Sequence, residues 1–135
     1  MKVVIASDSF KGSLSSREVA EAAVRGIRQV LPICELVGVN VADGGEGSVD
    51  AVVDTLGGKI VTATVNDSLG RPILARYGVV GRMAVIEMAA ASGLTLLTDE
   101  KRNPWLTSTY GTGEKILDAV KRGCRDFLVG VGGSD

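Results

Sequence analysis

The sequence predicts an α/β fold in which a parallel sheet with helices is joined to an antiparallel β-meander. Apolar, β-branched runs at residues 2–6 and 35–42 are separated by a helical pattern, which is typical of parallel strands joined through a helix. Residues 59–88 instead contain three short strand patterns separated by turn signals. Glycines gather where apolar runs end, as in DGGEG at residues 43–47, and this pattern suits close approach of a ligand to the backbone.

The composition narrows the class of protein. A length of 135 residues, 45% hydrophobic residues and a formal net charge of −1 are typical of a globular domain with its own core. The charge balance indicates neither a nucleic-acid partner nor a membrane partner, and no targeting or membrane-spanning pattern is seen. Cys34 and Cys124 are interpreted as reduced thiols of a cytoplasmic protein. The chain contains no histidine, so a histidine-based triad or base is excluded within it.

Local signals define the elements expected in the first half. Ser15 and Glu18 form a capping-box pattern at the start of a helix, and Pro32 ends that helix. The continuously apolar strand at residues 2–6 is expected to be buried. The expected order is a strand at 2–6, a helix up to 31, a strand at 35–42, a loop at 43–47, and a short helix stopped by Gly57 and Gly58.

The second half is expected to begin as a meander and to end with a helix and a strand. Residues 59–65 alternate apolar and polar side chains, which predicts a strand with one wetter face. Gly81 and Arg82 form a tight-turn signal between the next two strands. A short helical turn is expected near residue 90. Ile116, Leu117, Ala119 and Val120 then mark a helix capped by Gly123, and an apolar strand expected to be buried follows from residue 126.

These changes in the pattern of expected strands and helices predict three segments. Residues 1–58 form the first part of the parallel-sheet domain, residues 59–97 form the meander and a short helix, and residues 98–135 form a loop, a helix and a strand returning to the α/β sheet. The meander either belongs to a second α/β domain or leads into one. A strand that runs into GGS normally leads into a loop and a helix, so the chain is interpreted as the first part of a longer protein.

Three strand ends carry loops that are expected to converge on one sheet edge, where α/β proteins bind ligands. Glycine backbones and helix N-termini suit phosphate, and Lys11 adds a positive charge. Asp8 or Asp43 could hold Mg²⁺ or accept a proton from a substrate hydroxyl. The loop residues are Asp8, Ser9, Lys11, Gly12 and Ser13 after the first strand, Asp43, Gly44 and Gly45 after the second, and Gly132, Gly133 and Ser134 after the last.

Each of these signals has a structural alternative. Lys11 is equally explained as a solvated loop residue, the serines as turn or cap residues, and Asp43 with Glu46 as acids favouring a helix N-terminus. GxxxxGK[ST] is absent, so a P-loop is not indicated. The hydroxyls before the third helix are explained either as ligands for a carboxylate or phosphate or as caps of a solvated loop. They are Thr107, Ser108, Thr109, Tyr110 and Thr112.

Five blocks, in order, resemble the bacterial glycerate kinase family of the D-glycerate 2-kinase type. They are IASDSFKGSLSS, VADGGEGSVDAV, AVIEMAAASGLTLL, RNPWLTSTYGTGEKILDA and FLVGVGGS. The resemblance implies a two-domain α/β kinase with one Rossmann- or flavodoxin-like domain and a cleft between the domains. It also implies ATP and Mg²⁺ as cofactors and D-glycerate as substrate. The family continues after GGS with a run that is absent here, where Ser134 is followed by Asp135, which leaves open whether this chain alone is active.

The resemblance also implies roles for residues. Asp43, Lys11 and Asp8 would be catalytic, with transfer of the γ-phosphoryl group to the 2-hydroxyl of glycerate. Arg71 and Ser92 fall near family blocks and are expected at the substrate or phosphate site. The other residues expected there are Ser9, Gly12, Ser13, Gly44, Gly45, Thr107, Ser108, Thr112, Gly132, Gly133 and Ser134. Glu87 also falls near a family block. Its alternative interpretation is an acid that is paired for structural reasons only.

Other functions remain as alternatives at this point. The first is a non-catalytic nucleotide- or anion-binding α/β module. A nicotinamide-dependent oxidoreductase is disfavoured because the first strand-to-helix turn reads SDSFKGS and not GxGxxG. A chain that does not fold independently and a homodimer are also left open.

Overall fold

The structure is a computed structural model that describes residues 1–8, 10, 13–41 and 43–133. It divides into two compact units, Met1–Asp43 and Gly44–Asp135, which we call the amino-terminal and carboxy-terminal units. The sequence predicted a change of character at residue 59, whereas the compact units divide after residue 43. Within the described ranges, no helix is long and apolar enough to cross a membrane.

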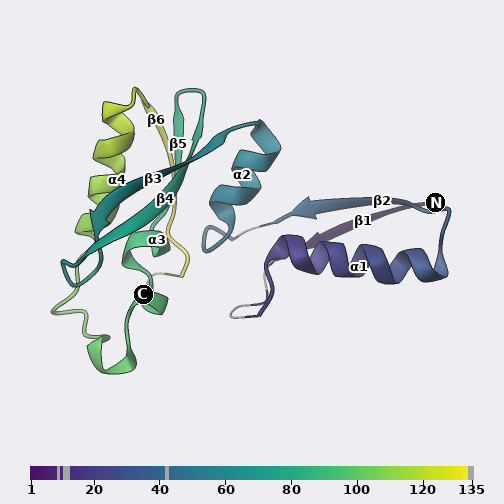
Figure 1. Ribbon diagram of the computed structural model, residues 1–135, viewed down its shortest axis with the longest axis horizontal. Helices are drawn as coiled ribbons and strands as arrows, with labels where there is room; N and C mark the ends of the chain where they lie inside the picture. Colours follow the sequence, from purple (N-terminus) through teal and green to yellow (C-terminus); the bar gives the residue numbers. More distant parts are fainter. Residues whose placement is uncertain (9, 11–12, 42, 134–135) are drawn as a thin grey trace. The chain divides into compact units, whose positions relative to one another are not determined.

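The amino-terminal unit is a β-α-β element (Figure 1). Strand β1 (Lys2–Ser7) and strand β2 (Glu35–Asn40) pair in parallel, and helix α1 (Ser16–Val30) connects them. The predicted capping box is confirmed, because the Ser15 side chain accepts from the Glu18 amide and the Glu18 carboxylate accepts from the Ser15 amide at 2.8 Å. The parallel pairing of β1 with β2 also confirms the pairing expected for the first strand.

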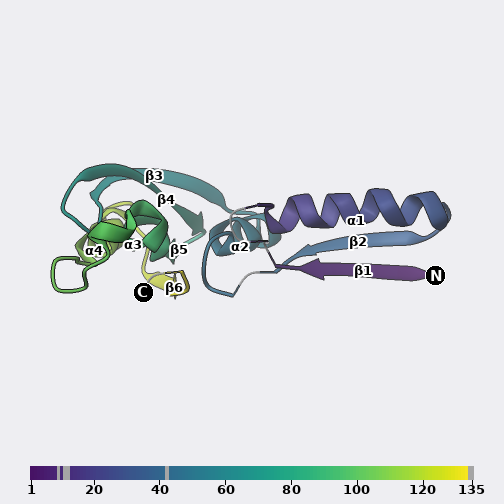
Figure 2. The same ribbon diagram turned by 90° about the horizontal axis from the view of Figure 1, so that it is seen from below.

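The prediction that the first strand is buried is wrong in this structure. Helix α1 covers one face of the two strands, where Ala20 lies 3.5 Å from the position of a Cβ on Gly38 (Figure 2). The opposite face carries Val4, which is 57% exposed, and Val39, which is 42% exposed. A parallel strand is buried only when helices cover both faces of its sheet, and among the described residues of this unit only one helix is present.

The carboxy-terminal unit is a four-stranded sheet with the order β3-β4-β5-β6. The first three strands form the predicted antiparallel meander, and β6 pairs with β5 in parallel. Its main elements are α2 (Ser48–Leu56), β3 (Lys59–Asn66), β4 (Pro72–Val80), β5 (Met83–Glu87), α3 (Ala89–Ser92), α4 (Tyr110–Lys121) and β6 (Asp126–Gly130), with single 3₁₀ turns at Leu94–Leu96 and Asp99–Lys101.

Strand β5 is the centre of this unit because helices cover both of its faces (Figure 1). Ala84 and Ile86 pack in the cluster that includes Ala119 of α4. Val85 points the other way and packs against α2 through Val49 and Val53. Successive residues of a strand alternate between faces, so this short strand contributes to two separate apolar clusters.

Predicted turns are confirmed where glycine adopts a left-handed conformation. Gly57 ends α2 at φ +72°, and Gly81 forms the β4–β5 hairpin at φ +58°. Gly123 follows α4 at φ +97°. Residues other than glycine rarely adopt these angles, which is why the sequence located these three ends well.

One expectation for the last strand, that it is buried, is wrong, and its return to the α/β sheet stays a prediction. Strand β6 pairs with β5 in the carboxy-terminal unit. It is the edge strand of that sheet, so its side chains remain partly exposed, with Phe127 at 37% and Leu128 at 48%. An apolar run alone does not tell which neighbour a strand has or whether the strand has one neighbour or two.

Candidate functional site

The carboxyl ends of the parallel strands β5 and β6 form the edge at which the predicted glycine loops meet. Glu87 and Gly130 are register partners at this edge, and the Met88 amide donates to the Gly130 carbonyl at 2.9 Å. Beyond it the chain continues into α3 on one side and into the glycines at 132 and 133 on the other. Ligands of α/β proteins bind beyond the carboxyl ends of parallel strands, so we call this the β5–β6 edge and treat it as the candidate site.

Two of the three predicted glycine loops lie side by side here. The Gly132 amide donates to the Gly44 carbonyl at 3.1 Å. A Cβ on Gly130 would lie 2.3 Å from the Gly44 oxygen, and one on Gly132 would lie 2.7 Å from the Gly45 nitrogen. Glycine is therefore required at residues 130 and 132 because another backbone segment approaches them, a reason that the sequence interpretation did not foresee.

The start of α2 adds a helix N-terminus to the β5–β6 edge. Its N-cap, Gly47, has φ +93° and contributes no side-chain cap. The Glu87 carboxylate takes that role, because Oε1 accepts from the Val49 amide at 2.7 Å. A carboxylate at the positive end of a helix is stabilising, and this one is only 8% exposed. Beside it, the Ser48 hydroxyl oxygen is buried and has no hydrogen-bond partner among the described residues.

Lys115 of α4 approaches the same strand end from the opposite face of the sheet. It is fully buried, and its Nζ donates to the Glu87 carbonyl oxygen. Burial lowers its pKa to about 8, and the negative charge of Glu87 limits that fall. The Glu87 backbone carbonyl thus links the strand to α4, and its carboxylate links the strand to α2.

Sequence reasoning missed Lys115 because the predicted apolar stripe of α4 mixed residues of two faces. Ala119 is buried and Ile116 packs against the core, as predicted, but Leu117 and Val120 are 52% and 40% exposed. The buried face is instead Gly111, Thr112, Lys115 and Ala119. The spacing of small residues three and four positions from a lysine was the available signal for that face.

Hydroxyl groups around the start of α4 form a second group within this unit. Ser92 Oγ lies 3.3 Å from Thr112 Oγ1, so those two predicted residues are neighbours. The Ser108 amide donates to the Ser68 carbonyl at 2.9 Å, and Ser108 Oγ accepts from the Tyr110 amide at 3.1 Å. Ser108 therefore serves as a local cap, in agreement with the structural alternative for this stretch. Thr107 is half-buried nearby in sequence.

Arg71 lies at the β3–β4 turn and is held by Asp67. Its Nε donates to Asp67 Oδ2 at 2.6 Å, and one terminal nitrogen donates to the Leu96 carbonyl at 3.5 Å. Burial of Asp67 tends to raise the pKa of its carboxyl, but the bonds from Arg71 and from backbone amides hold that pKa below its usual value. The Arg71 side chain is 49% exposed, so part of it remains open to solvent.

The other predicted residues belong to the amino-terminal unit or lie outside the described part. Asp8 follows β1 and Asp43 ends the unit, both with exposed side chains, and the Ser13 amide donates to the Phe10 carbonyl at 2.8 Å. Their convergence with the β5–β6 edge stays a prediction. Ser9, Lys11, Gly12 and Ser134 lie outside the described residues.

The side chains that the structure describes include no group of three or more carboxylates or thiols placed to hold a metal ion. Mg²⁺ is usually held by one or two carboxylates together with the phosphates of a nucleotide, and the carboxylates predicted for that role are Asp8 and Asp43.

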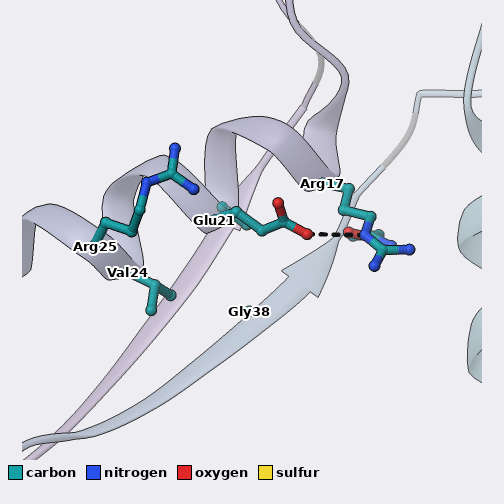
Figure 3. Close-up of a pocket in the computed structure, with 7 residues that line it drawn as sticks. Arg17, Glu21, Val24, Arg25 and Gly38 are labelled. Carbon is teal, nitrogen blue, oxygen red and sulfur yellow. Dashed lines mark hydrogen bonds and ion pairs between the residues drawn. The ribbon is translucent and has the colours of Figure 1, made fainter. Parts of the chain in front are cut away.

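A separate groove of about 400 Å³ lies in the amino-terminal unit between α1 and β2 (Figure 3). Arg17 and Glu21 line it and form an ion pair with a 3.0 Å separation, and Arg25 and Val24 lie along the same helix above Gly38. None of the residues that line it was predicted as a site residue. Its exposed ion pair contributes little energy, and the groove offers no buried polar group.

Comparisons with known proteins agree with this architecture. A model of the glycerate kinase family matches residues 3–135. The glycerate kinase of Bacillus subtilis (strain 168) is 50% identical over 99% of this chain, and the glycerate 2-kinase of Escherichia coli (strain K12) is 48% identical over 99% of it. A solved Salmonella typhimurium LT2 protein, provisionally named glycerate kinase 2, superposes with a TM-score of 0.80 at 46% identity.

These matches cover nearly all of this chain but only part of each relative. The chain spans 36% of the length of the two curated relatives and 36% of the solved Salmonella chain. With 50% identity and a family match from residue 3 to residue 135, the chain belongs to the glycerate kinase family.

Proposed function

We propose that this chain supplies part of the active site of an ATP-dependent kinase that phosphorylates D-glycerate at its 2-hydroxyl. The observation that carries the proposal is the meeting of Gly44 and Gly45 with Gly130 and Gly132 at the carboxyl ends of β5 and β6. Ligands of α/β proteins bind beyond the carboxyl ends of parallel strands, so a small phosphorylated ligand is proposed to bind at that edge. The protein is proposed to be cytoplasmic.

The β5–β6 edge has features that suit a phosphate group. The buried Ser48 hydroxyl lacks a partner among the described residues, and buried hydroxyls normally have one. The Val49 amide already serves Glu87, so a phosphate is proposed to use the amides and hydroxyl before it in the chain. We propose that Gly44, Gly45, Gly132, Gly133 and the outlying Ser134 form this cradle, with Ser9, Gly12 and Ser13 contributing from the amino-terminal unit.

Charged residues are proposed to act on the transferred group. Lys11 would offset negative charge that develops on the phosphoryl oxygens, and Asp43 would orient or deprotonate the 2-hydroxyl. Mg²⁺, proposed to be held by Asp8 or Asp43 together with ATP phosphates, would neutralise charge between phosphate groups.

Residues around α3 and α4 are proposed to hold glycerate. The half-exposed Arg71 side chain suits a carboxylate, since arginine forms paired hydrogen bonds with planar anions. Ser92 and Thr112, whose hydroxyls are 3.3 Å apart, would bond hydroxyls of the substrate, with Thr107 and Ser108 bordering the site.

The proposal is tested by measuring D-glycerate-dependent release of ADP. Two proteins are compared, namely this chain and a fusion of it to the remaining part of the Bacillus subtilis relative, because the chain spans 36% of that protein. We expect turnover in the fusion, with ³¹P NMR identifying the 2-phosphate as product. A folded fusion that binds ATP without turnover would favour the alternative of a non-catalytic nucleotide-binding module.

The proposed catalytic roles are tested in the fusion by Lys11→Met and Asp43→Asn. Loss of a well-placed charge should reduce kcat by roughly 10²- to 10³-fold. Lys59→Met and Asp54→Asn are matched controls, since both side chains are exposed and were not predicted to lie at the site. Kinetics close to those of the parent for both catalytic variants would remove these residues from the mechanism.

A further inference from the structure

A buried lysine links helix α4 to the end of strand β5 and has no part in the mechanism proposed above. We propose that Lys115 is a positioning residue, which fixes Glu87 so that Glu87 holds the first turn of α2 at the β5–β6 edge. The inference starts from three contacts made around one residue. Lys115 Nζ donates to the Glu87 carbonyl, Glu87 Oε1 accepts from the Val49 amide at 2.7 Å, and Glu87 is the register partner of Gly130.

The lysine is costly for the fold, which argues that its ammonium group has a specific use. An ammonium group loses its hydration when it is buried, and Lys115 is fully buried. Its neighbours on the same face, Thr112 and Ala119, are small, so an apolar side chain of similar length would fill the space without that cost. A lysine here gains only what its Nζ contacts, and the contact that the structure gives is the Glu87 carbonyl.

The contacts continue from Glu87 to the glycine backbones. Val49 is the second residue of α2, and the chain just before it contains Gly44 and Gly45. The Gly44 carbonyl accepts from Gly132, and Gly130 accepts from the residue that follows Glu87. Displacing Glu87 would therefore disturb both segments that form the proposed phosphate cradle.

The two acidic residues of α4 already accept hydrogen bonds from other groups. Glu114 accepts from Asn66, and Asp118 accepts from Tyr77 and Arg122. Glu87 is the charged group whose field acts on Lys115. The role of Lys115 in catalysis rests on the proposed function, but its coupling to Glu87 and α2 does not.

The coupling is tested in this chain by NMR between pH 6 and pH 10. Lys115 should titrate with a midpoint near 8, and the amide signals of Val49, Gly44 and Gly132 should move with the same midpoint. Lys115→Met should abolish this shared transition. Lys121→Met is the matched control, because Lys121 is an exposed lysine on the same helix, and it should leave the transition unchanged.

A second variant keeps the test decisive if Lys115→Met does not fold. In Glu87→Gln the carboxamide oxygen can still accept from Val49, but the negative charge is lost, so the Lys115 midpoint should move further down. An unmoved Lys115 midpoint in Glu87→Gln, or a Val49 transition that persists in Lys115→Met, would overturn the inference. Neither readout requires ATP or turnover, so failure of the proposed function would be seen separately, as absence of ADP release by the fusion.

Discussion

Asp67 is a charged residue that the fold buries at the β3–β4 turn, with 2% of its surface exposed. Its Oδ1 accepts from the amides of Leu69 and Arg71, both at 2.9 Å, and its Oδ2 accepts from Arg71 Nε. These bonds favour the ionised form and outweigh burial, so the pKa of the carboxyl is lower in the folded chain than in the unfolded chain. The stabilisation is therefore present above the unfolded pKa of about 3.9 and is lost as pH falls through the folded pKa.

We expect Asp67→Asn to lower the free energy of unfolding at pH 7 by about 1.5–3 kcal/mol, the range for hydrogen bonds to a charged group. The difference from the parent should shrink as pH falls below about 4, because the carboxyl of the unfolded parent becomes protonated there while that of the folded parent does so only at lower pH. Urea unfolding of the variant and the parent across this pH range measures the difference in the free energy of unfolding. Asp99→Asn is the control, because the side chain of Asp99 is 87% exposed in its pair with Arg102 and should contribute little. A difference that stays constant down to pH 2 would contradict the assignment.

Ser48 and Ser16 are each the first residue of a helix but differ in their hydrogen bonds. Ser16 Oγ donates to the Ser7 carbonyl at 2.5 Å, whereas Ser48 Oγ is buried without a partner among the described residues. Ser16→Ala should cost about 1 kcal/mol, and Ser48→Ala should leave stability unchanged or raise it by up to about 1 kcal/mol. Thermal unfolding measures both changes. If the Ser48 hydroxyl bonds a phosphate as proposed, the same variant should weaken ATP binding by the fusion.

At the scale of elements, helix α4 shows why a boundary was misplaced. The hydroxyl residues up to Thr112 were expected to precede this helix, yet α4 starts at Tyr110 and includes Gly111 and Gly113. A Cβ on Gly111 would lie 1.7 Å from the Asn66 carbonyl oxygen, so glycine allows the helix to pack closely on the end of β3. Local propensity disfavours glycine inside a helix, and only the tertiary contact explains its presence.

The two glycines of α4 are therefore expected to respond in opposite ways to alanine. Gly111→Ala must displace Asn66 and should destabilise the unit by about 3 kcal/mol, the upper part of the usual overpacking range. A Cβ on Gly113 would meet no atom within 4 Å, so Gly113→Ala should stabilise α4 by up to about 1 kcal/mol. Guanidinium unfolding of the two variants provides the comparison. Equal effects would show that helix propensity, and not the contact with β3, governs both positions.

Features that depend on residues close together in the sequence were predicted well. Features that depend on contacts between residues far apart in the sequence were not. The capping box of Ser15 and Glu18 and the hairpin at Gly81 each depend on a few neighbouring residues, and both are confirmed. The partner of β6 and the burial of Lys115 depend on residues far away in the chain, and periodicity carries no information about them. The glycine loops were identified, but the reason for their glycines was another backbone segment.

At the scale of the molecule, the two units differ in how much of their sheets is covered. The two-stranded sheet of the amino-terminal unit has one helix, while β5 of the carboxy-terminal unit lies between two. Two strands alone are marginal in water, and stability within a protein follows local burial.

We therefore expect amide hydrogens of β1 and β2 to exchange with solvent much faster than those of β4 and β5. Hydrogen exchange followed by NMR on this chain measures the difference directly. The strands of each pair serve as internal controls for one another, since paired strands should share one opening rate. Slower exchange in β1 and β2 than in β5 would contradict the expected order of stability.

The position of β5 between α2 and α4 has a consequence for synthesis on the ribosome. Helix α2 and strands β3 to β5 emerge before α4, so Val85 can pack on α2 while Ala84 and Ile86 still face water. That apolar surface stays open until residues 110–121 have left the exit tunnel. A nascent chain paused before that point exposes this apolar surface, and a chaperone would therefore bind it most strongly at that stage.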